Sequence, residues 1–325
     1  MNDSGDAPLG LVLSTVTAGG PREFIDVART AEARGFAAVL VNEGRGDALA
    51  CAQAIASATA RVTVGTNIAN IYFRHPFLAA ASARAIVELV GPRLVLGFGI
   101  SHRALLARLG IDMGDARTRL RDYVRQVKEA LAGTAGSGFL QAPRSPHPVT
   151  VLAAANTVET AAIAGAEGDG LMPYLTPVDH VPLLIAAARA AAGSERAGSL
   201  DCIMSVPTFL HDDEAQARSA ARYNLAFFAV LPNYRRQWRR AGFGQAMDAI
   251  RALGPEATRT AIAPLIPDEL IDAVCIVGNA ARCRTQLARC RRAGVRLPLL
   301  AVSPVNEERH QATVRVIDRL APRSG

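Results

Sequence analysis

Short apolar runs alternate with longer amphipathic segments along most of the chain. Eight of these runs have the length of buried strands, and they lie at residues 9–13, 37–41, 62–66, 94–98, 150–153, 170–172, 202–208 and 297–302. Near-continuous apolar strands that are separated by helices are typical of a parallel sheet covered on its faces. Eight such units predict an α/β fold that closes into a (β/α)8 TIM barrel.

The segments between these runs repeat their apolar positions with the period of a helix. Helices are predicted at residues 22–34, 48–58, 77–89, 116–131, 157–166, 179–191 and about 307–320, with a long helical stretch after Asp213. Pro21 suits the first turn of the first helix, and Gly35 suits the position just after its end. Residues 133–148 are rich in Gly, Ser and Pro and are predicted to form a loop.

Residues 231–279 break the regular spacing of strands and helices. This segment is too long for a simple connection, so we predict a helical insertion between strands seven and eight. The insertion would wall or cover the mouth of the barrel. We therefore expect a single barrel domain that spans residues 1–325 and carries this insertion.

The composition is that of an ordinary soluble α/β protein, with half of the residues apolar and a fifth charged. No stretch approaches the roughly 20 apolar residues that span a bilayer. The first residues lack the pattern of an export signal, and five dispersed cysteines argue against a disulfide framework. We expect a cytoplasmic protein with reduced thiols and no membrane partner.

The net charge of +7 raises the question of an acidic partner. Arginines gather at Arg235, Arg236, Arg239 and Arg240, and again across residues 282–292. The second group follows an amphipathic helical pattern, which indicates a solvated outer face. Because no nucleic-acid-binding motif accompanies these arginines, we expect no nucleic-acid partner, while attraction to a small anion stays open.

Polar residues gather where the predicted strands end, which is where (β/α)8 barrels carry their catalytic groups. They follow strands two to six at residues 42–47, 67–76, 97–103, 153–157 and 173–176. Glu43 is the carboxylate that directly follows strand two, and helix capping or a salt bridge to Arg45 is its structural alternative. The pattern predicts a pocket at the C-terminal end of the barrel.

Two glycines and a histidine follow strand four, in the string GFGISH. His102 stands where a GxGxxG motif would have its third glycine, which disfavours dinucleotide binding. A flat ring close to Gly97 and Gly99 explains the glycines better, although strand-to-helix packing explains Gly97 equally well. His102 is the preferred acid or base, because a histidine titrates near neutral pH. His75 precedes a proline and is predicted to cap the third helix.

Asn156 is predicted to cap the helix after strand five, with Glu159 at the third helical position. Capping alone explains this pattern. A helix that starts on the pocket rim would also favour a phosphate, to which Asn156, Thr157 and Thr160 could add donors. No HExxH motif, cysteine pair or carboxylate cluster indicates a metal, and no GxSxG motif indicates a serine hydrolase.

Several strings of the sequence resemble those of one enzyme superfamily. VGTNIANIYFRHP at residues 64–76 and RLVLGFGISH at residues 93–102 are similar to the third and fourth βα units of the bacterial luciferase-like superfamily. Within it, they most resemble the coenzyme F420-dependent oxidoreductases. VLVNEGRGD at residues 39–47 and LPNYRRQWRRAGF at residues 231–243 extend the likeness over almost the whole chain.

The resemblance implies a deazaflavin held across the barrel mouth, against a bulge in strand three with a cis peptide bond at Asn67–Ile68. The cofactor contacts it implies come from Asn67, Ile68, Ala69, Asn70, Gly97, Gly99 and Ser101, and the cofactor phosphate would lie at Ala154, Ala155, Asn156 and Thr157. Two positions depart from the pattern. Many relatives have histidine in place of Gly44, and two glycines in place of Ala155 and Asn156.

We therefore expect an F420-dependent oxidoreductase that transfers hydride between the deazaflavin C5 and a small organic substrate. The reaction would reduce a C=C, C=N or C=O bond or oxidise an alcohol, with His102 moving the proton and Glu43 ordering the ring or the substrate. An FMN-dependent monooxygenase is one alternative, and a ligand-binding barrel without turnover, which Gly44 permits, is another. Nucleic-acid binding is the weakest of the alternatives. The expected partner is a small-molecule substrate, and formation of a homodimer stays open.

Overall fold

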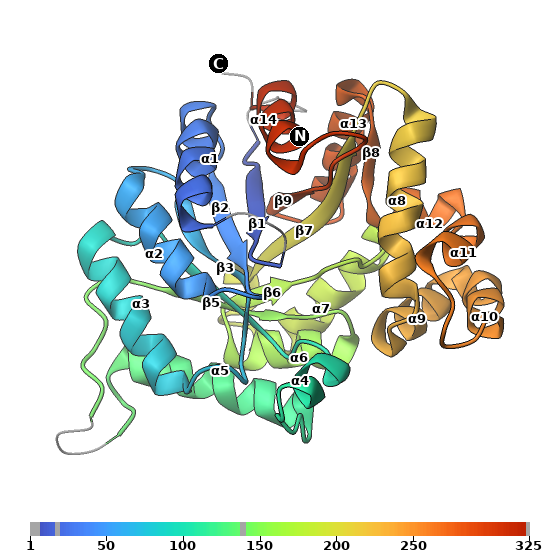
Figure 1. Ribbon diagram of the computed structural model, residues 1–325. Coiled ribbons are helices and arrows are strands. Elements are labelled where there is room, and N and C mark those ends of the chain that lie inside the picture. The colour runs from blue at the N-terminus through green and yellow to red at the C-terminus, as the bar shows by residue number, and fades with distance from the viewer. Residues whose placement is uncertain (1–6, 17–19, 137–140, 323–325) are drawn as a thin grey trace.

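The computed structural model describes residues 7–16, 20–136 and 141–322. Its parallel strands form a closed barrel (Figure 1) from β1 (Gly10–Ser14), β2 (Ala38–Asn42), β3 (Thr63–Asn70), β4 (Leu94–Gly99), β5 (Thr150–Ala154), β6 (Gly170–Met172), β7 (Asp201–Leu210) and β9 (Leu297–Val302). The ring closes because β6 pairs with β7 and β9 pairs with β1. The predicted (β/α)8 barrel is confirmed, and each predicted strand overlaps one strand of the barrel.

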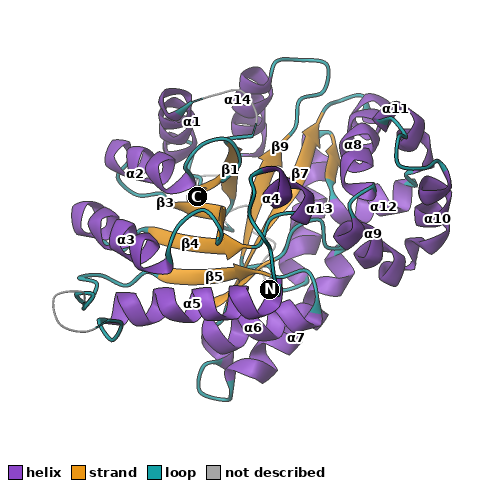
Figure 2. Cartoon of the chain, turned by 60° about the horizontal axis from the view of Figure 1, so that its bottom comes forward, coloured by secondary structure: helices purple, strands orange, loops and turns teal. Residues whose placement is uncertain are grey.

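Helices surround the barrel and bury their apolar faces against the outside of its strands (Figure 2). They are α1 (Pro21–Ala33), α2 (Ala48–Ala58), α3 (Pro76–Val90), α5 (Ala116–Ala132), α6 (Val158–Glu167), α7 (Val181–Ala192), α13 (Ala280–Arg292) and α14 (Arg309–Leu320). The short helix α4 (Arg103–Arg108) follows β4 and does not belong to this outer ring. Each was predicted except α4. With six residues, α4 has too few turns to show a period in the sequence.

Between β7 and β9 the chain builds a separate group of helices, on the right of Figure 1. These are α8 (Glu214–Ala229), α9 (Pro232–Trp238), the π-helical turn η4 (Arg239–Phe243), α10 (Gly244–Ala252), α11 (Arg259–Ile262), η5 (Ala263–Leu265) and α12 (Asp268–Val274). The predicted helical insertion is therefore confirmed, while the single-domain assignment stays a prediction. One strand was not predicted: β8 (Ile276–Gly278) pairs with the end of β7, outside the barrel.

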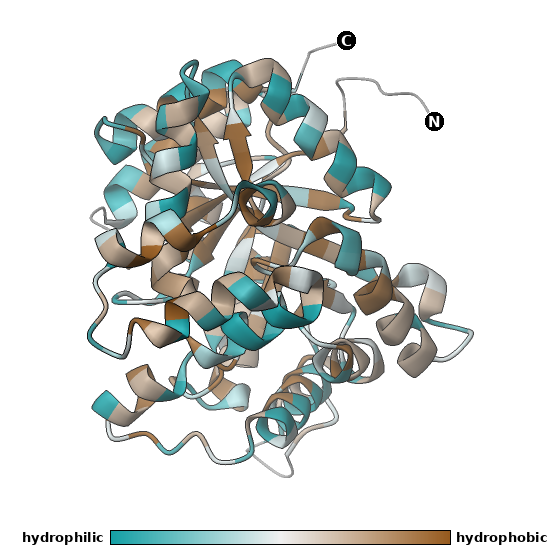
Figure 3. Ribbon diagram, turned by 90° about the vertical axis from the view of Figure 1, so that its right-hand side faces the viewer, coloured by the Kyte–Doolittle hydropathy of each residue, from teal (hydrophilic) through white to brown (hydrophobic). Residues whose placement is uncertain are grey.

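Apolar side chains gather in three groups. The largest lies between strands and outer helices, and a second packs the insertion around Trp238, which is fully buried. The third fills the inside of the barrel with residues such as Leu40, Leu152 and Met172. Figure 3 shows hydrophobic strands within helices of mixed hydropathy. Because side chains fill the barrel, a ligand can reach it only at an end.

The ends of several helices follow the predicted signals. Pro21 lies in the first turn of α1, and Gly35, with a φ of +80°, follows its end. The ring Nδ1 of His75 accepts the N–H of Phe77 at 3.2 Å, which confirms the predicted cap of α3. Within the described ranges, no helix has the length and apolar character needed to cross a bilayer. Residues 1–6, where no export signal was expected, lie outside those ranges, as do residues 137–140 of the predicted loop.

Candidate active site

The carboxyl ends of the barrel strands meet at one end of the barrel, so residues that are distant in sequence come together there. The side-chain amide of Asn42, at the end of β2, donates to the carbonyl oxygen of Asn67 in β3 at 3.2 Å. The side chain of Asn67 in turn donates to the sulfur of Met172 in β6 at 3.3 Å. Polar contacts therefore join three strands at the predicted mouth.

Strand β3 is irregular at this mouth. The Asn67–Ile68 peptide bond is cis, as the resemblance implied, and the pairing with β4 shifts register between Thr66 and Ala69. The carbonyl oxygen of Ile68 accepts the N–H of Glu43, at the end of β2, at 3.1 Å. The predicted bulge is thus present, and it is held from the neighbouring strand.

Glu43 is buried beside the bulge, with a side chain only 2% exposed. Its carboxylate accepts the N–H of Asn70 at 2.7 Å and the N–H of Ala48 at 3.2 Å. The guanidinium of Arg74 donates to both carboxylate oxygens and also to Asp47 at 3.0 Å. Both oxygens of Glu43 are therefore engaged by donors of the protein itself.

These contacts join the end of β2, the bulge of β3 and the start of α2. The salt bridge that was considered for Glu43 exists, but Arg45 was the wrong partner. Arg74 lies 31 residues from Glu43 in sequence and reaches it from the loop between β3 and α3. The arrangement suits a carboxylate that positions the backbone around the mouth.

Two glycines of β4 face inward among protein atoms. A Cβ at Gly97 would lie 2.2 Å from the Met172 sulfur and 2.6 Å from the Thr66 carbonyl oxygen. A Cβ at Gly99 would lie 2.9 Å from the Ile68 side chain. Packing inside the barrel therefore suffices to explain Gly97, one of the two explanations that the sequence left open.

We expect Gly97→Ala to lower the free energy of unfolding by about 1–3 kcal/mol, because backbone and core atoms would have to move. Denaturant unfolding of the protein without any cofactor measures this. Gly198→Ala is the matched control, since nothing lies within 4 Å of an added Cβ there, and it should cost no stability. If Gly97→Ala left the free energy of unfolding unchanged, packing would not explain the glycine, and contact with a flat ring would be the better explanation.

His102 lies at the start of α4, directly after β4, and is half-buried. Its ring does not cap the helix, and the described part of the chain provides no hydrogen-bond partner for it. Burial lowers the pKa of His102 below its usual value of 6.5, which favours the neutral ring near pH 7. Ser101 before it adopts a φ of +57°. Both ring nitrogens are thus available for proton transfer to a ligand.

The helix after β5 begins one residue later than predicted. Thr157 caps α6, and it exchanges hydrogen bonds with Thr160, at 3.1 and 3.3 Å, in a capping box. The proposed cap at Asn156 with Glu159 at the third position was wrong. The side-chain oxygen of Asn156 instead accepts the N–H of Tyr174 at 2.9 Å, because the chain after β6 passes close to it.

Charged side chains surround this helix start. Hydrogen bonds from the Thr157 hydroxyl and from its own N–H lower the pKa of Glu159, and the nearby Arg117 and Arg240 lower it further. Glu159 is exposed and can swing away from the helix end. The donors and the two arginines then match the chemistry of a phosphate.

The insertion closes over the chain that follows β6 through residues that the sequence patterns did not single out. The indole N–H of Trp238 donates to the carbonyl oxygen of Leu175 at 3.0 Å. The side-chain amide of Gln237 donates to the Thr176 hydroxyl at 2.9 Å. Tyr234 on the same helix lies 5.9 Å from the His102 ring, between centroids. Tyr234 and Trp238 form an aromatic roof over the mouth. The only sign of this roof in the sequence is the presence of these aromatic residues in the string at residues 231–243.

The structure also shows where the two groups of arginines and the cysteines lie. Arg236, Arg239 and Arg240 are exposed, and Arg239 forms an ion pair with Asp248. Arg282 and Arg289 form ion pairs with Asp272 and Asp179. All five cysteines are buried and free. Over the described ranges, no three or more His, Cys, Asp or Glu residues group in a way that could hold a metal ion.

Comparison with known proteins identifies the family. The model of the luciferase-like monooxygenase family matches residues 9–297. The chain belongs to this family. By that membership the protein is an oxidoreductase enzyme.

Its relatives include proteins that are named as F420-dependent enzymes. A Mycobacterium tuberculosis protein, named as a coenzyme F420-dependent oxidoreductase, is 26% identical over 94% of this chain and 98% of its own length. The 5,10-methylenetetrahydromethanopterin reductase of Methanolobus tindarius is 24% identical over 88% of this chain and 91% of its own length.

Solved structures share the fold of this luciferase-like protein. The F420-dependent tetrahydromethanopterin reductase of Methanopyrus kandleri superposes with a TM-score of 0.77 at 16% identity, covering 97% of this chain and 98% of the other. The monooxygenase RslO1 of Streptomyces bottropensis superposes with a TM-score of 0.68 at 21% identity, covering 97% of each chain. At these identities the likeness is one of fold alone, and it includes both kinds of enzyme.

The luciferase-like site departs from the expected pattern at Gly44 for a visible reason. A Cβ there would lie 2.1 Å from the Val16 side chain and 3.1 Å from its backbone nitrogen. The N–H of Gly44 donates to the Thr15 hydroxyl at 2.7 Å. The chain after β1 therefore occupies the space that a histidine side chain would need.

Proposed function

We propose that the protein is a coenzyme F420-dependent oxidoreductase that transfers hydride between the deazaflavin C5 and a small organic substrate. The reaction reduces a C=C, C=N or C=O bond or oxidises an alcohol. The observation that carries the proposal is the full-length similarity to a relative named for this coenzyme. The half-buried His102, whose ring nitrogens have no hydrogen-bond partner in the described part of the chain, lies near the irregular β3 and supports the proposal from the geometry.

The residues at the mouth fit such a cofactor. A flat ring would rest against Asn67, Ile68, Ala69 and Asn70, with Gly99 and Ser101 on the neighbouring strand end; Gly97 would support it from within the barrel. The cofactor phosphate would lie at Ala154, Ala155, Asn156 and Thr157, where Arg117 and Arg240 supply positive charge. When bound, the deazaflavin supplies a carbon centre that accepts or releases hydride.

The residues of the chain divide the remaining work. A ring nitrogen of His102 takes the proton of an alcohol, or returns one to a reduced substrate, and its lowered pKa favours the first role near pH 7. Glu43 acts through Asn70 and Arg74, and it holds the bulge rather than touching the substrate. The aromatic roof of Tyr234 and Trp238 excludes water from the mouth.

The first test is cofactor binding by the purified protein. F420 should bind at least about tenfold more tightly than FMN, measured by fluorescence quenching and by calorimetry. Arg240→Ala should weaken F420 binding but leave binding of a deazaflavin without the phosphate unchanged. Tight binding of FMN without binding of F420 would favour the monooxygenase, a reading that the family's own name supports.

Turnover and the oligomeric state of the protein both stay predictions. Binding of F420 without hydride transfer to or from any alcohol, imine or enone would favour the ligand-binding barrel. The homodimer is a prediction as well, and sedimentation of the purified protein tests it.

A further inference from the structure

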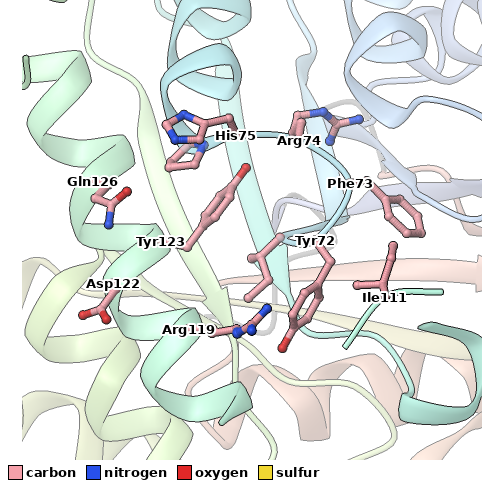
Figure 4. A pocket seen from close by; sticks show the side chains of 11 residues that line it. Tyr72, Phe73, Arg74, His75, Ile111, Arg119, Asp122, Tyr123 and Gln126 are labelled. Carbon is pink, nitrogen blue, oxygen red and sulfur yellow. The ribbon is translucent and has the colours of Figure 1, made fainter. Parts of the chain in front are cut away.

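A cavity of about 520 Å³ lies beside the barrel mouth, between the β3–α3 loop and the first half of α5. Tyr72, Phe73 and Ile111 form apolar walls, and His75, Arg119 and Tyr123 present polar groups to it (Figure 4). A volume of this order is typical of small-molecule sites.

The Tyr123 side chain marks the floor of this cavity. The residue is only 6% exposed, and its hydroxyl has no hydrogen-bond partner in the part of the chain that the structure describes. Figure 4 shows the hydroxyl pointing toward the side where His75 and Arg74 lie. Burial raises the pKa of Tyr123, so the hydroxyl keeps its proton and can donate. A buried donor without an acceptor is rare in folded proteins, so a ligand that supplies an acceptor would be expected to bind here.

A second donor faces the same space. The Nδ1 of His75 accepts the backbone N–H of Phe77, so the proton of the neutral ring is carried by Nε2. The cavity thus combines a hydroxyl donor and an imidazole donor at one end with apolar walls at the other.

The charges around the cavity favour an anion. Asp122 is the acidic residue among its lining, and it is bound by Arg121 and Arg125. Arg119 forms no ion pair within the described ranges; it donates to the Asp112 carbonyl and lies 5.6 Å from the Tyr72 ring centroid. Because no carboxylate neutralises the Arg119 guanidinium in the described ranges, its positive charge attracts a negatively charged ligand.

The cavity is separate from the barrel mouth. Neighbouring residues of a strand face opposite sides, so Phe98 points outward while Gly97 points toward Met172 inside the barrel. The rings of Tyr123 and Phe98 pack at 5.0 Å between centroids, which places Tyr123 outside the barrel wall.

We propose that this cavity is a binding site for a small aromatic carboxylate. Its carboxylate would accept from the Tyr123 hydroxyl and the His75 Nε2–H, and its ring would lie between Tyr72, Phe73 and Ile111. The proposal does not depend on the identity of the redox cofactor, because the two sites lie on opposite sides of the barrel wall.

Benzoate is the probe, and benzyl alcohol is its uncharged counterpart. Calorimetry on the full chain should give a benzoate Kd of roughly 1 mM, with benzyl alcohol at least about tenfold weaker. Tyr123→Phe keeps the ring packing on Phe98 and removes only the hydroxyl, so it should weaken benzoate binding about tenfold. Tyr223→Phe, at an exposed tyrosine of the insertion, should leave it unchanged.

Two readouts separate binding from folding. The melting temperature of Tyr123→Phe should be no lower than that of the wild type, because the hydroxyl has no hydrogen-bond partner to lose in residues 7–16, 20–136 and 141–322. F420 binding should also be unaffected. The proposal is overturned if the wild type binds no benzoate at roughly ten times the expected Kd, or if Tyr123→Phe binds it as well as the wild type does.

Discussion

Replacing Glu43 with alanine is expected to lower the free energy of unfolding by about 3–5 kcal/mol, the usual cost of removing one partner from a buried ion pair. The change would leave the buried guanidinium of Arg74 beside Asp47 alone. It would also leave the N–H groups of Asn70 and Ala48 without their acceptor. Denaturant unfolding, with the slope compared between variants, measures the loss.

The exposed ion pair between Arg34 and Asp318 provides the control, and Asp318→Ala should cost at most about 1 kcal/mol. The double variant Glu43→Ala with Arg74→Ala should be less destabilised than the sum of its single variants, since it leaves no unpaired charge. A stable Glu43→Ala that binds cofactor normally but has lost turnover would contradict the positioning role. It would restore Glu43 as a residue that acts on the substrate.

Replacing His102 with asparagine is expected to lower kcat by about 10²–10⁴-fold, the range that general acid–base catalysis contributes. The binding of F420 and the melting temperature should change little, because the described part of the chain makes no hydrogen bond to the ring. Steady-state kinetics with F420 and a responsive substrate measures the effect. His310→Asn, at an exposed histidine, is the control and should keep wild-type turnover.

The pH profile of the same reaction distinguishes its directions. Burial lowers the pKa of His102 below 6.5, so the ring stays neutral at pH 6.5 and is protonated only in more acid solution. Alcohol oxidation needs the neutral ring, and its rate should hold to below pH 6.5 before it falls. Reduction needs the protonated ring, and its rate should fall as the pH rises through that lowered pKa. A profile of His102→Asn with the same inflection would assign the titration to another group.

The sequence predicted the barrel well because buried parallel strands are nearly continuous apolar runs and their helices are long enough to show a period. The same reasoning missed β8 and α4, which have three and six residues. It also placed the start of α6 one residue early. A threonine can cap a helix as an asparagine can, and only the contact of Asn156 with Tyr174 separates the two.

The sequence by itself determined the fold class, the strand ends that form the mouth, and the resemblance that led to the cofactor proposal. These depend on the order and periodicity of residues along the chain. Only the tertiary structure decided that Glu43 is held by Arg74 rather than by the nearby Arg45, and that Met172 fills the space beside Gly97. It alone showed that the Tyr123 hydroxyl is buried and has no hydrogen-bond partner among the described residues. Such contacts join residues far apart in the chain, and the pattern along a sequence does not specify which side chains meet where distant segments come together.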